Sequence, residues 1–324
     1  MSEPVIRVED LHVALRRKRD GSIIRAVNGV SFAVEKGRTL GIVGESGCGK
    51  STTAMAVLQL LPRNAEVRGA IHFDGRNLAQ ESRKALRTIR GRRIGMIFQD
   101  PMVALDPLFT VGDQLAEPLR EHLDLDGKEL RARQIELLQA VGISSPETRL
   151  KQYPHQMSGG MLQRIVGAIA ISCNPDLLIA DEPTTALDPT AQAAYLELLE
   201  RLSDTYGLAL IVVTHDMGVV SRICDDVMVM YAGQAVEYGP VRGIFDTPRH
   251  PYTQALLASI PHGVEQRGLL PTIEGQPPDL AALPPGCPFA ARCSKVIERC
   301  VVEPPPPVDL PGGQRAFCWR AGEA

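Results

Sequence analysis

The chain has 324 residues, of which 44% are hydrophobic and 23% are charged, and its formal net charge is -3. This composition is that of an ordinary folded protein and excludes a disordered or fibrous chain. The small net charge gives no overall attraction to nucleic acid. No apolar run approaches the roughly 18 residues of a membrane span, and the N-terminus lacks the basic and apolar segments of a secretory signal. We therefore expect a soluble, cytoplasmic protein. If it works at a membrane, another chain must supply the membrane spans.

The first chemical motif lies between a predicted strand and a predicted helix. The apolar run Leu40–Val43 predicts a buried strand, and apolar residues at helical spacing as far as Leu61 predict a helix. Between them, GESGCGKS at residues 44–51 matches the phosphate-loop pattern. Glycines let backbone N–H groups surround phosphate oxygens, Lys50 reaches the β- and γ-phosphates, and the Ser51 hydroxyl binds Mg²⁺. The residues expected to bind nucleotide here are Gly44, Glu45, Ser46, Gly47, Cys48, Gly49, Lys50, Ser51 and Thr52.

A second anion-binding helix end is predicted in residues 156–171, which read QMSGGMLQRIVGAIAI. Ser158 is a typical N-cap residue, and the apolar residues after Gly160 recur at helical spacing. The two glycines leave backbone N–H groups exposed at the start of this helix. Hydrolysis of a nucleotide within one chain does not explain a second such end, so far from the first.

Two carboxylates follow the apolar run Leu177–Ala180, which predicts a strand buried on both faces. Such strands deliver their next residues to the carboxyl edge of the sheet, where ligands bind. Asp181 is therefore expected to hold Mg²⁺, and Glu182 to orient or deprotonate an attacking water.

His215 follows another predicted buried strand, Leu208–Val213. A lone histidine after a strand is more often structural than catalytic. At the edge of a sheet that carries a phosphate loop, however, a histidine donor is suited to detect the γ-phosphate. We therefore include His215 among the predicted catalytic residues.

The last part of the chain is proline-rich after residue 261 and can bury little apolar area, so it needs another source of stability. In a cytoplasmic protein a cysteine cluster favours metal ligation over disulfides. The spacing matches neither the usual zinc nor the usual iron–sulfur pattern, so zinc, a [4Fe–4S] cluster and a metal-free tail all stay open. The candidate ligands are Cys287, Cys293, Cys300 and Cys318. The cysteines outside this cluster are read as packing residues: Cys48, Cys173 and Cys224.

Taken together, these motifs resemble the ATPases of the ATP-binding-cassette (ABC) family. SGGMLQ at residues 158–163 is similar to the signature sequence of that family, and Gln99 and the ALD at residues 186–188 also fall in the family's order. The resemblance implies an α/β fold, with a RecA-like phosphate-loop NTPase core, an antiparallel β subdomain and a helical subdomain at approximately residues 100–165. It implies an ABC ATPase domain over residues 1–260 and a cysteine-containing extension over residues 261–324.

The resemblance also implies a head-to-tail dimer, in which the signature of one cassette closes on the γ-phosphate held by the other. Because each motif occurs once, the second cassette must be another chain. Gln99 is expected to contact Mg²⁺ and the attacking water, and adenine is expected on Ile24 and Val27, since the aromatic residue common in the family is absent. Cys48 replaces a small hydroxyl residue, which predicts sensitivity of the loop to thiol reagents. The residues implied at the dimer's nucleotide are Ser158, Gly159, Gly160, Gln163 and Asp188.

A narrower resemblance comes from YPHQMSGGMLQR at residues 153–164 and HPYTQALLASIP at residues 250–261. These segments look like the ATPase subunits of dipeptide and oligopeptide importers, a group that includes nickel transporters. This implies ATP and Mg²⁺ as ligands and a position on the cytoplasmic face of the membrane. The implied partners are a second ATPase, two permeases and an extracytoplasmic solute-binding protein, with no nucleic acid.

Some of these ATPases carry an iron–sulfur cluster in a similar tail, which favours [4Fe–4S] over Zn²⁺. The competing function is a soluble ABC ATPase acting on nucleic acid or ribosomes. Relatives of that kind carry long coiled-coil insertions or two cassettes, and the sequence contains neither.

Overall fold

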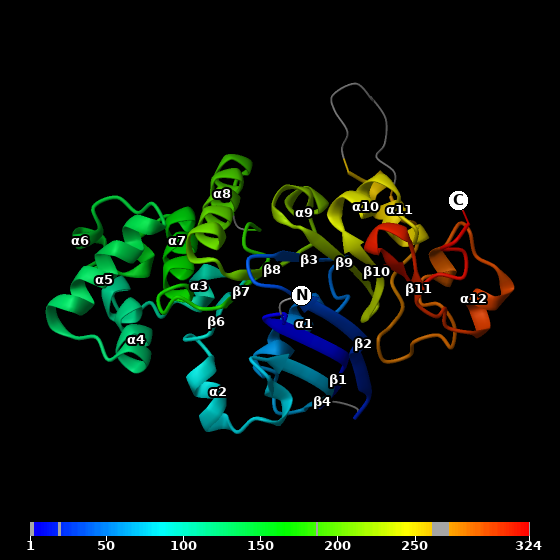
Figure 1. Cartoon of the computed structure of the whole chain (residues 1–324), viewed down its shortest axis with the longest axis horizontal. Coiled ribbons are helices and arrows are strands. Elements are labelled where there is room, and N and C mark those ends of the chain that lie inside the picture. Colours follow the sequence, from blue (N-terminus) through cyan, green and yellow to red (C-terminus); the bar gives the residue numbers. More distant parts are fainter. Residues whose placement is uncertain (1–2, 19–20, 186, 261–271, 324) are drawn as a thin grey trace. The chain divides into compact units, whose positions relative to one another are not determined.

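The computed structural model describes residues 3–18, 21–185, 187–260 and 272–323, and the chain forms two compact units (Figure 1). The helical unit comprises residues 80–213 together with residues 1–6 and 34–38. The phosphate-loop unit comprises residues 7–33, 39–79 and 214–324.

The strands of the helical unit are parallel and lie in the order β8-β7-β6. Their bounds are β6 (Ile94–Ile97), β7 (Leu177–Asp181) and β8 (Ala209–Thr214). In register, Leu177 lies opposite both Ile94 and Ala209. Every residue of β7 and β8 is buried, as expected for parallel strands covered on both faces. Both predicted buried strands are thus confirmed.

Helices α4, α5 and α7 pack against one another in the same unit (Figure 1). The capping box of Thr110 and Asp113 begins α4, because each side chain accepts a hydrogen bond from the backbone N–H of the other. The helices of this unit are α2 (Arg83–Ile89), α3 (Pro101–Ala104), α4 (Val111–Leu123), α5 (Gly127–Ala140), α6 (Pro146–Arg149), α7 (Gly159–Ala170) and α8 (Pro189–Tyr206), with a 3-10 turn at Pro154–Gln156.

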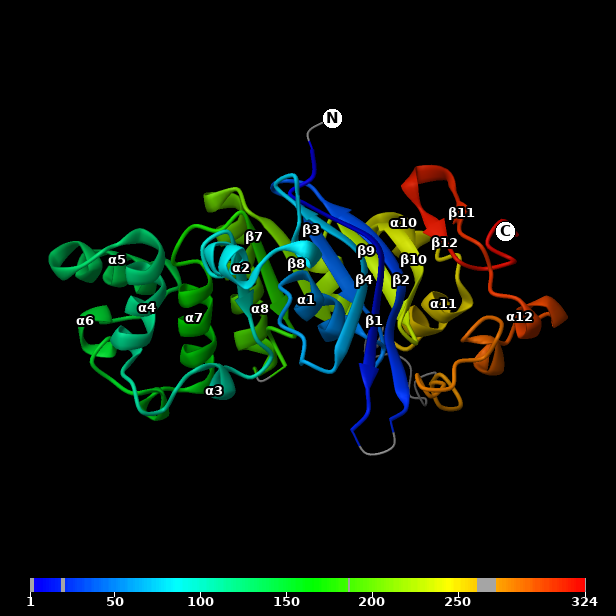
Figure 2. The same ribbon diagram turned by 90° about the horizontal axis from the view of Figure 1, so that it is seen from below.

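Two groups of strands build the phosphate-loop unit, in the orders β2-β1-β4-β5 and β11-β12-β10-β9-β3. Figure 2 shows β1, β2 and β4 side by side. In the second group, β3 and β9 are parallel, whereas the pairs β9–β10, β10–β12 and β11–β12 are antiparallel. The strands are β1 (Ile6–Arg16), β2 (Ile23–Val34), β3 (Thr39–Val43), β4 (Ala65–Phe73), β5 (Arg76–Asn77), β9 (Asp226–Tyr231), β10 (Gln234–Pro240), β11 (Val308–Asp309) and β12 (Arg315–Ala316).

The helix after the phosphate loop is shorter than expected, since it ends at Val57 and not at Leu61. Gln59 adopts a φ of 52°, which takes the backbone out of the right-handed helix. The helices of this unit are α1 (Lys50–Val57), α9 (Met217–Ile223), α10 (Val241–Asp246), α11 (Pro251–Ala258) and α12 (Glu298–Val302), with 3-10 turns at Leu78–Gln80, Ala290–Arg292 and Pro311–Gly313.

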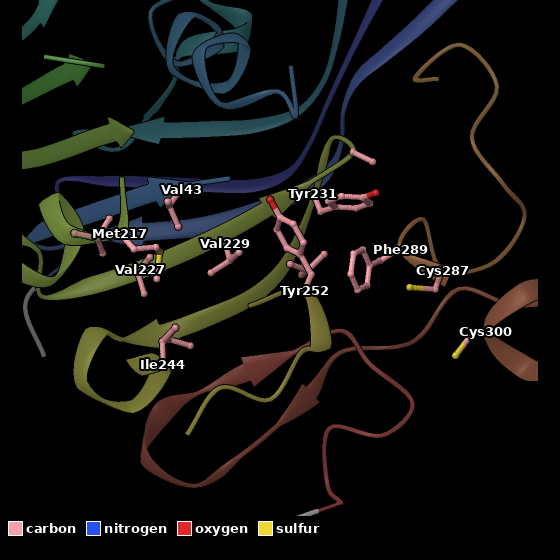
Figure 3. Packing of buried hydrophobic residues seen from close by; sticks show 13 residues of the cluster. Val43, Met217, Val227, Val229, Tyr231, Ile244, Tyr252, Cys287, Phe289 and Cys300 are labelled. Atoms are coloured by element: carbon pink, nitrogen blue, oxygen red, sulfur yellow. The ribbon is translucent and has the colours of Figure 1, made fainter. Parts of the chain in front are cut away.

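The cysteine-rich C-terminal stretch packs into the phosphate-loop unit. Strand β12 pairs with β10, so that Ala316 lies opposite Glu237. Cys287, Phe289 and Cys300 are buried in one hydrophobic core with Val43, the last residue of the strand that enters the loop (Figure 3). This core joins the C-terminal stretch to the strand before the loop, while the predicted domain boundary at residue 260 stays a prediction.

Within the parts of the chain that the structure covers, no helix combines the length and the apolar character that crossing a bilayer requires.

Candidate nucleotide site

The phosphate loop connects the end of β3 to the start of α1. The Lys50 side chain is only 5% exposed, and its ammonium group donates hydrogen bonds to the backbone oxygens of Gly44 (2.8 Å) and Glu45 (3.0 Å). Ser46 and Gly47, at the turn of the loop, are exposed. The loop thus encloses the lysine and turns its middle toward solvent, as a loop that receives an anion requires.

Gly44 and Gly49 are required by close approach of other backbone segments. A Cβ atom at Gly44 would lie 2.2 Å from the oxygen of Met230, and one at Gly49 would lie 2.3 Å from the oxygen of Ala26. Gly49 also has a φ of 103°, which L side chains rarely adopt. Glycine is therefore dictated at both positions by β9 and β2, independently of any nucleotide.

Cys48 is buried within the loop, with 5% of its surface exposed. Burial raises the pKa of its thiol, although nearby Lys50 acts in the opposite direction. Because the thiolate is the reactive form, this environment lowers the reactivity of Cys48. The expected sensitivity of the loop to thiol reagents is thus opposed by the position of the side chain.

A cavity of about 780 Å³ opens along β2. Val27 lines it, as do Ile23 and Arg25, but Ile24 does not. Alternation along the strand explains the difference, because residues 23, 25 and 27 share one face and residue 24 points to the other. Val27 thus faces the cavity and Ile24 does not, and both stay predictions as contacts of adenine.

In the helical unit the structure brings together Gln99 and Glu182, which belong to different motifs. Gln99 follows β6, and its side-chain amide donates a hydrogen bond to the Glu182 carboxylate at 3.1 Å. Asp181 is the last residue of β7, pairs in register with Val213 and is 5% exposed. The carboxylate oxygens of Asp181 and the side-chain oxygens of serine and glutamine are the kind of metal ligand that Mg²⁺ prefers.

Glu182 has a second partner, Thr185, which sequence reasoning missed. The Thr185 hydroxyl donates to the same carboxylate oxygen at 2.9 Å, and the Glu182 backbone N–H donates to Val213 at 2.8 Å. Glu182 also adopts a φ of 45°, unusual for a residue other than glycine. One sequence pattern could have identified Thr185 as a partner of Glu182: a hydroxyl residue three positions after a carboxylate, in a short turn.

His215 lies in the phosphate-loop unit, immediately after the last residue of β8, and its side chain is exposed. Asp216, the next residue, caps α9 by accepting a hydrogen bond from the Gly218 N–H at 2.7 Å. The short α9 begins at Met217, so His215 lies on the turn between β8 and α9.

The signature segment begins α7 as predicted. Ser158 is the N-cap, and its hydroxyl accepts a hydrogen bond from the Met161 N–H at 3.4 Å. Ser158 and Gly159 are exposed, whereas Gln163 is 1% exposed and its side-chain nitrogen has no hydrogen-bond partner in the described residues. The exposed helix end thus consists of Ser158 and Gly159, with Gly160 partly buried, whereas the Gln163 side chain is buried.

Asp188 caps the next helix, α8, by accepting hydrogen bonds from Thr190 and Ala191, both at 3.0 Å. Ala186, the first residue of the ALD motif, lies outside the described residues. The position of Asp188 is thus explained by the helix it begins.

The four cysteines of the C-terminal stretch all line one small cavity of about 10 Å³, close to the space of one water molecule. Burial raises the pKa of Cys287 to about 11, with smaller contributions from the neighbouring cysteines. The Cys293 sulfur accepts a hydrogen bond from the Lys295 N–H at 3.4 Å. As the side chains are placed, however, no three histidine, cysteine, aspartate or glutamate residues in the described ranges form a group that could hold a metal ion. A metal at the four sulfurs is therefore left as a proposal.

Comparison with known proteins gives the family. The ABC transporter family model matches residues 27–185, and the model of the oligopeptide/dipeptide transporter C-terminal region matches residues 236–300. The dipeptide transport ATP-binding protein DppD of Bacillus subtilis is 51% identical over 300 residues, which cover 92% of this chain and 89% of the relative. A probable peptide ABC transporter ATP-binding protein of Sinorhizobium fredii is 48% identical, over 93% of this chain and 91% of the relative.

A solved structure of a dimeric ATP-binding cassette in a post-hydrolysis state, bound to ADP and Pi, has a TM-score of 0.65 and 27% sequence identity to this chain. The match covers 74% of this chain and 99% of the chain in the solved structure. The fold and the sequence therefore agree, and the chain belongs to the ABC transporter family, as an ATPase subunit of the dipeptide and oligopeptide transporter group.

Proposed function

We propose that this chain powers the import of dipeptides and oligopeptides by hydrolysing ATP on the cytoplasmic face of the membrane. The relative from Bacillus subtilis, which is named for dipeptide transport, supports this proposal through its 51% identity over nearly the whole chain. The proposal includes related small solutes, such as nickel, as alternative substrates of the transporter. Neither relative reported above is named for work on nucleic acid or ribosomes.

The roles proposed for the residues follow the chemistry of phosphoryl transfer. The loop N–H groups and Lys50 would hold the phosphates, and Ser51, Asp181 and Gln99 would hold Mg²⁺, which would neutralise charge on the phosphates. Glu182 accepts a proton from water as its oxygen attacks the γ-phosphorus. The bond between that phosphorus and the bridging oxygen breaks, and ADP and phosphate leave. His215 donates a hydrogen bond to the γ-phosphate.

The contacts of Glu182 suit this role. Both Gln99 and Thr185 donate hydrogen bonds to one of its oxygen atoms, which orients the carboxylate. The neighbouring Asp181 is proposed as a ligand of Mg²⁺.

The proposed assembly has two cassettes, two permeases and an extracytoplasmic solute-binding protein. The exposed start of α7 contacts the nucleotide held by the second cassette, and Asp188 lies at the interface between the cassettes. The second cassette is a sister chain or a second copy of this one. Alternating closure and release of the cassettes passes motion to the permeases.

The test of this function is peptide uptake into vesicles that contain the permeases, the binding protein and both cassettes. A labelled dipeptide should accumulate when ATP is supplied on the side of this chain, and Glu182→Gln should abolish accumulation. Uptake of the dipeptide that does not depend on this chain would contradict the proposal.

We also propose that Cys287, Cys293, Cys300 and Cys318 bind a [4Fe–4S] cluster, with Zn²⁺ as the alternative. Support comes from the preference of soft thiolates for these metals and from the fact that all four cysteines line one cavity, which at about 10 Å³ would have to open to admit a cluster. Protein purified without oxygen should be brown and contain iron and sulfide, or else be colourless and contain zinc. Protein with neither metal would leave the tail as a metal-free element and contradict this proposal.

A further inference from the structure

One side chain of the C-terminal stretch reaches the phosphate loop. Arg292 forms a two-pronged ion pair with Glu45, the second residue of the loop, with N···O distances of 2.9 and 3.1 Å. The Arg292 side chain is 5% exposed and that of Glu45 is 27% exposed. The pair is thus shielded from water and screened by salt much less than a surface pair.

All five N–H donors of the Arg292 guanidinium are engaged. Besides the two bonds to Glu45, they reach the backbone oxygens of Glu274 (2.9 Å) and Ile273 (3.0 Å) and the hydroxyl of Tyr231 (3.2 Å). The guanidinium is a rigid planar fork, so these five bonds fix its position. A lysine has three donors on a flexible stem and could not reproduce them.

Glu45 is also held through its backbone. Its N–H donates to the Tyr252 hydroxyl at 3.0 Å, and its backbone oxygen accepts from Lys50 at 3.0 Å. Tyr252 packs against Tyr231 and Phe289, with ring centroids 4.7 and 5.4 Å away (Figure 3). The first turn of the loop is therefore clamped between Lys50 on one side and the aromatic core on the other.

From these contacts we propose that Arg292 is a positioning residue of the ATP site. It holds Glu45, Glu45 sets the first turn of the phosphate loop, and that turn directs Lys50. The C-terminal stretch is then part of the ATP site, and its integrity controls nucleotide affinity. This inference rests on the proposed role of Lys50 in binding ATP.

The experiment measures the Kd of a fluorescent ATP analogue for the full chain, for Arg292→Gln, for Glu45→Gln and for the double variant. Each single change should weaken binding about tenfold, which corresponds to about 1.4 kcal/mol. The double variant should be no weaker than the weaker single variant, because both changes break the same pair. The KM for ATP should rise while kcat stays within about twofold, a split that a general loss of folded protein would not produce.

The matched control is Arg315→Gln, which breaks an exposed pair with Asp309 in the same C-terminal stretch. It should leave the Kd unchanged. Arg292→Lys tests the geometry of the guanidinium, since it keeps the positive charge but loses the planar set of donors. It is also the variant expected to fold if Arg292→Gln does not. It should also weaken binding of the analogue.

The inference is overturned if Arg292→Lys and Glu45→Gln bind the analogue as the parent does, or if the effects of the two single changes multiply in the double variant. Lys50→Ala separates this failure from failure of the proposed ATP site. If the parent chain binds the analogue no better than Lys50→Ala does, the proposed ATP site is refuted. If the parent chain and the Arg292 variants all bind the analogue tightly, only the positioning role of Arg292 is refuted.

Discussion

At the scale of single residues, the catalytic assignment depends on Glu182. This residue has a left-handed backbone conformation, with a φ of 45°, and its carboxylate receives hydrogen bonds from Gln99 and Thr185. Unusual backbone angles at a non-glycine residue persist only where the surroundings enforce them, and here the bond from its N–H to Val213 does so. The carboxylate is thus held in one orientation before substrate binds.

Glu182→Gln should therefore separate binding from chemistry. The amide has nearly the same shape but does not accept the proton of the attacking water, so turnover should fall by roughly 10²- to 10⁴-fold while the Kd for ATP changes little. The measurement is steady-state phosphate release together with nucleotide binding. Turnover at the parent rate would show that another group activates the water.

Much of this site follows from the sequence, residue by residue. A glycine-rich turn between strand and helix and a carboxylate pair after a buried strand are local patterns, and each predicts its chemistry from its own neighbours. The roles of Thr185 and Arg292 were not predicted, for a physical reason. Turns and tertiary contacts bring these residues to their partners, Glu182 and Glu45, and Arg292 lies 247 positions from Glu45 in the sequence.

At the scale of elements, capping side chains decide where the functional helices begin. Ser158 begins α7 and Asp188 begins α8, and the latter accepts two backbone hydrogen bonds of 3.0 Å. Serine caps can be predicted from sequence because a short polar residue precedes an apolar-periodic run. The end of α1 could not, because the positive φ of Gln59 interrupts apolar spacing that continues to Leu61.

Asp188→Ala should lower the free energy of unfolding by about 1 kcal/mol, the usual cost of losing an N-cap. Asp188→Asn keeps an oxygen acceptor and should cost only a few tenths of a kcal/mol. Chemical denaturation of the purified chain measures both. If Asp188→Asn destabilises the chain as much as Asp188→Ala does, the carboxylate charge matters more than the cap.

At the scale of the whole molecule, the C-terminal stretch is structurally continuous with the phosphate-loop unit. It adds β12 to the edge of β10 and buries Phe289 against Tyr231 and Tyr252. Composition alone predicts a tail that buries little apolar area and needs another source of stability. The prediction did not foresee this aromatic contact, because Tyr231 and Tyr252 lie in segments read as parts of the ATPase domain.

A chain that ends at residue 260 should therefore be less stable than the full chain. Phe289→Ala alone should cost about 3 to 5 kcal/mol, because it leaves a cavity in the core, and the truncation should cost at least as much. Val302→Ala, at an exposed position, is the control and should stay within about 0.5 kcal/mol of the parent. A truncated chain with the parent's denaturation midpoint would show that the C-terminal stretch adds no stability.

As the ATPase subunit of a peptide transporter, the chain should respond to its membrane partners. The most direct test of this expectation is the ATPase rate of the purified chain with and without its permeases, measured beside parallel samples with DNA and with ribosomes. We expect the rate to rise with the permeases and the solute-loaded binding protein, and Glu182→Gln to remove this rise. Stimulation by DNA or ribosomes, with none from any membrane partner, would contradict it.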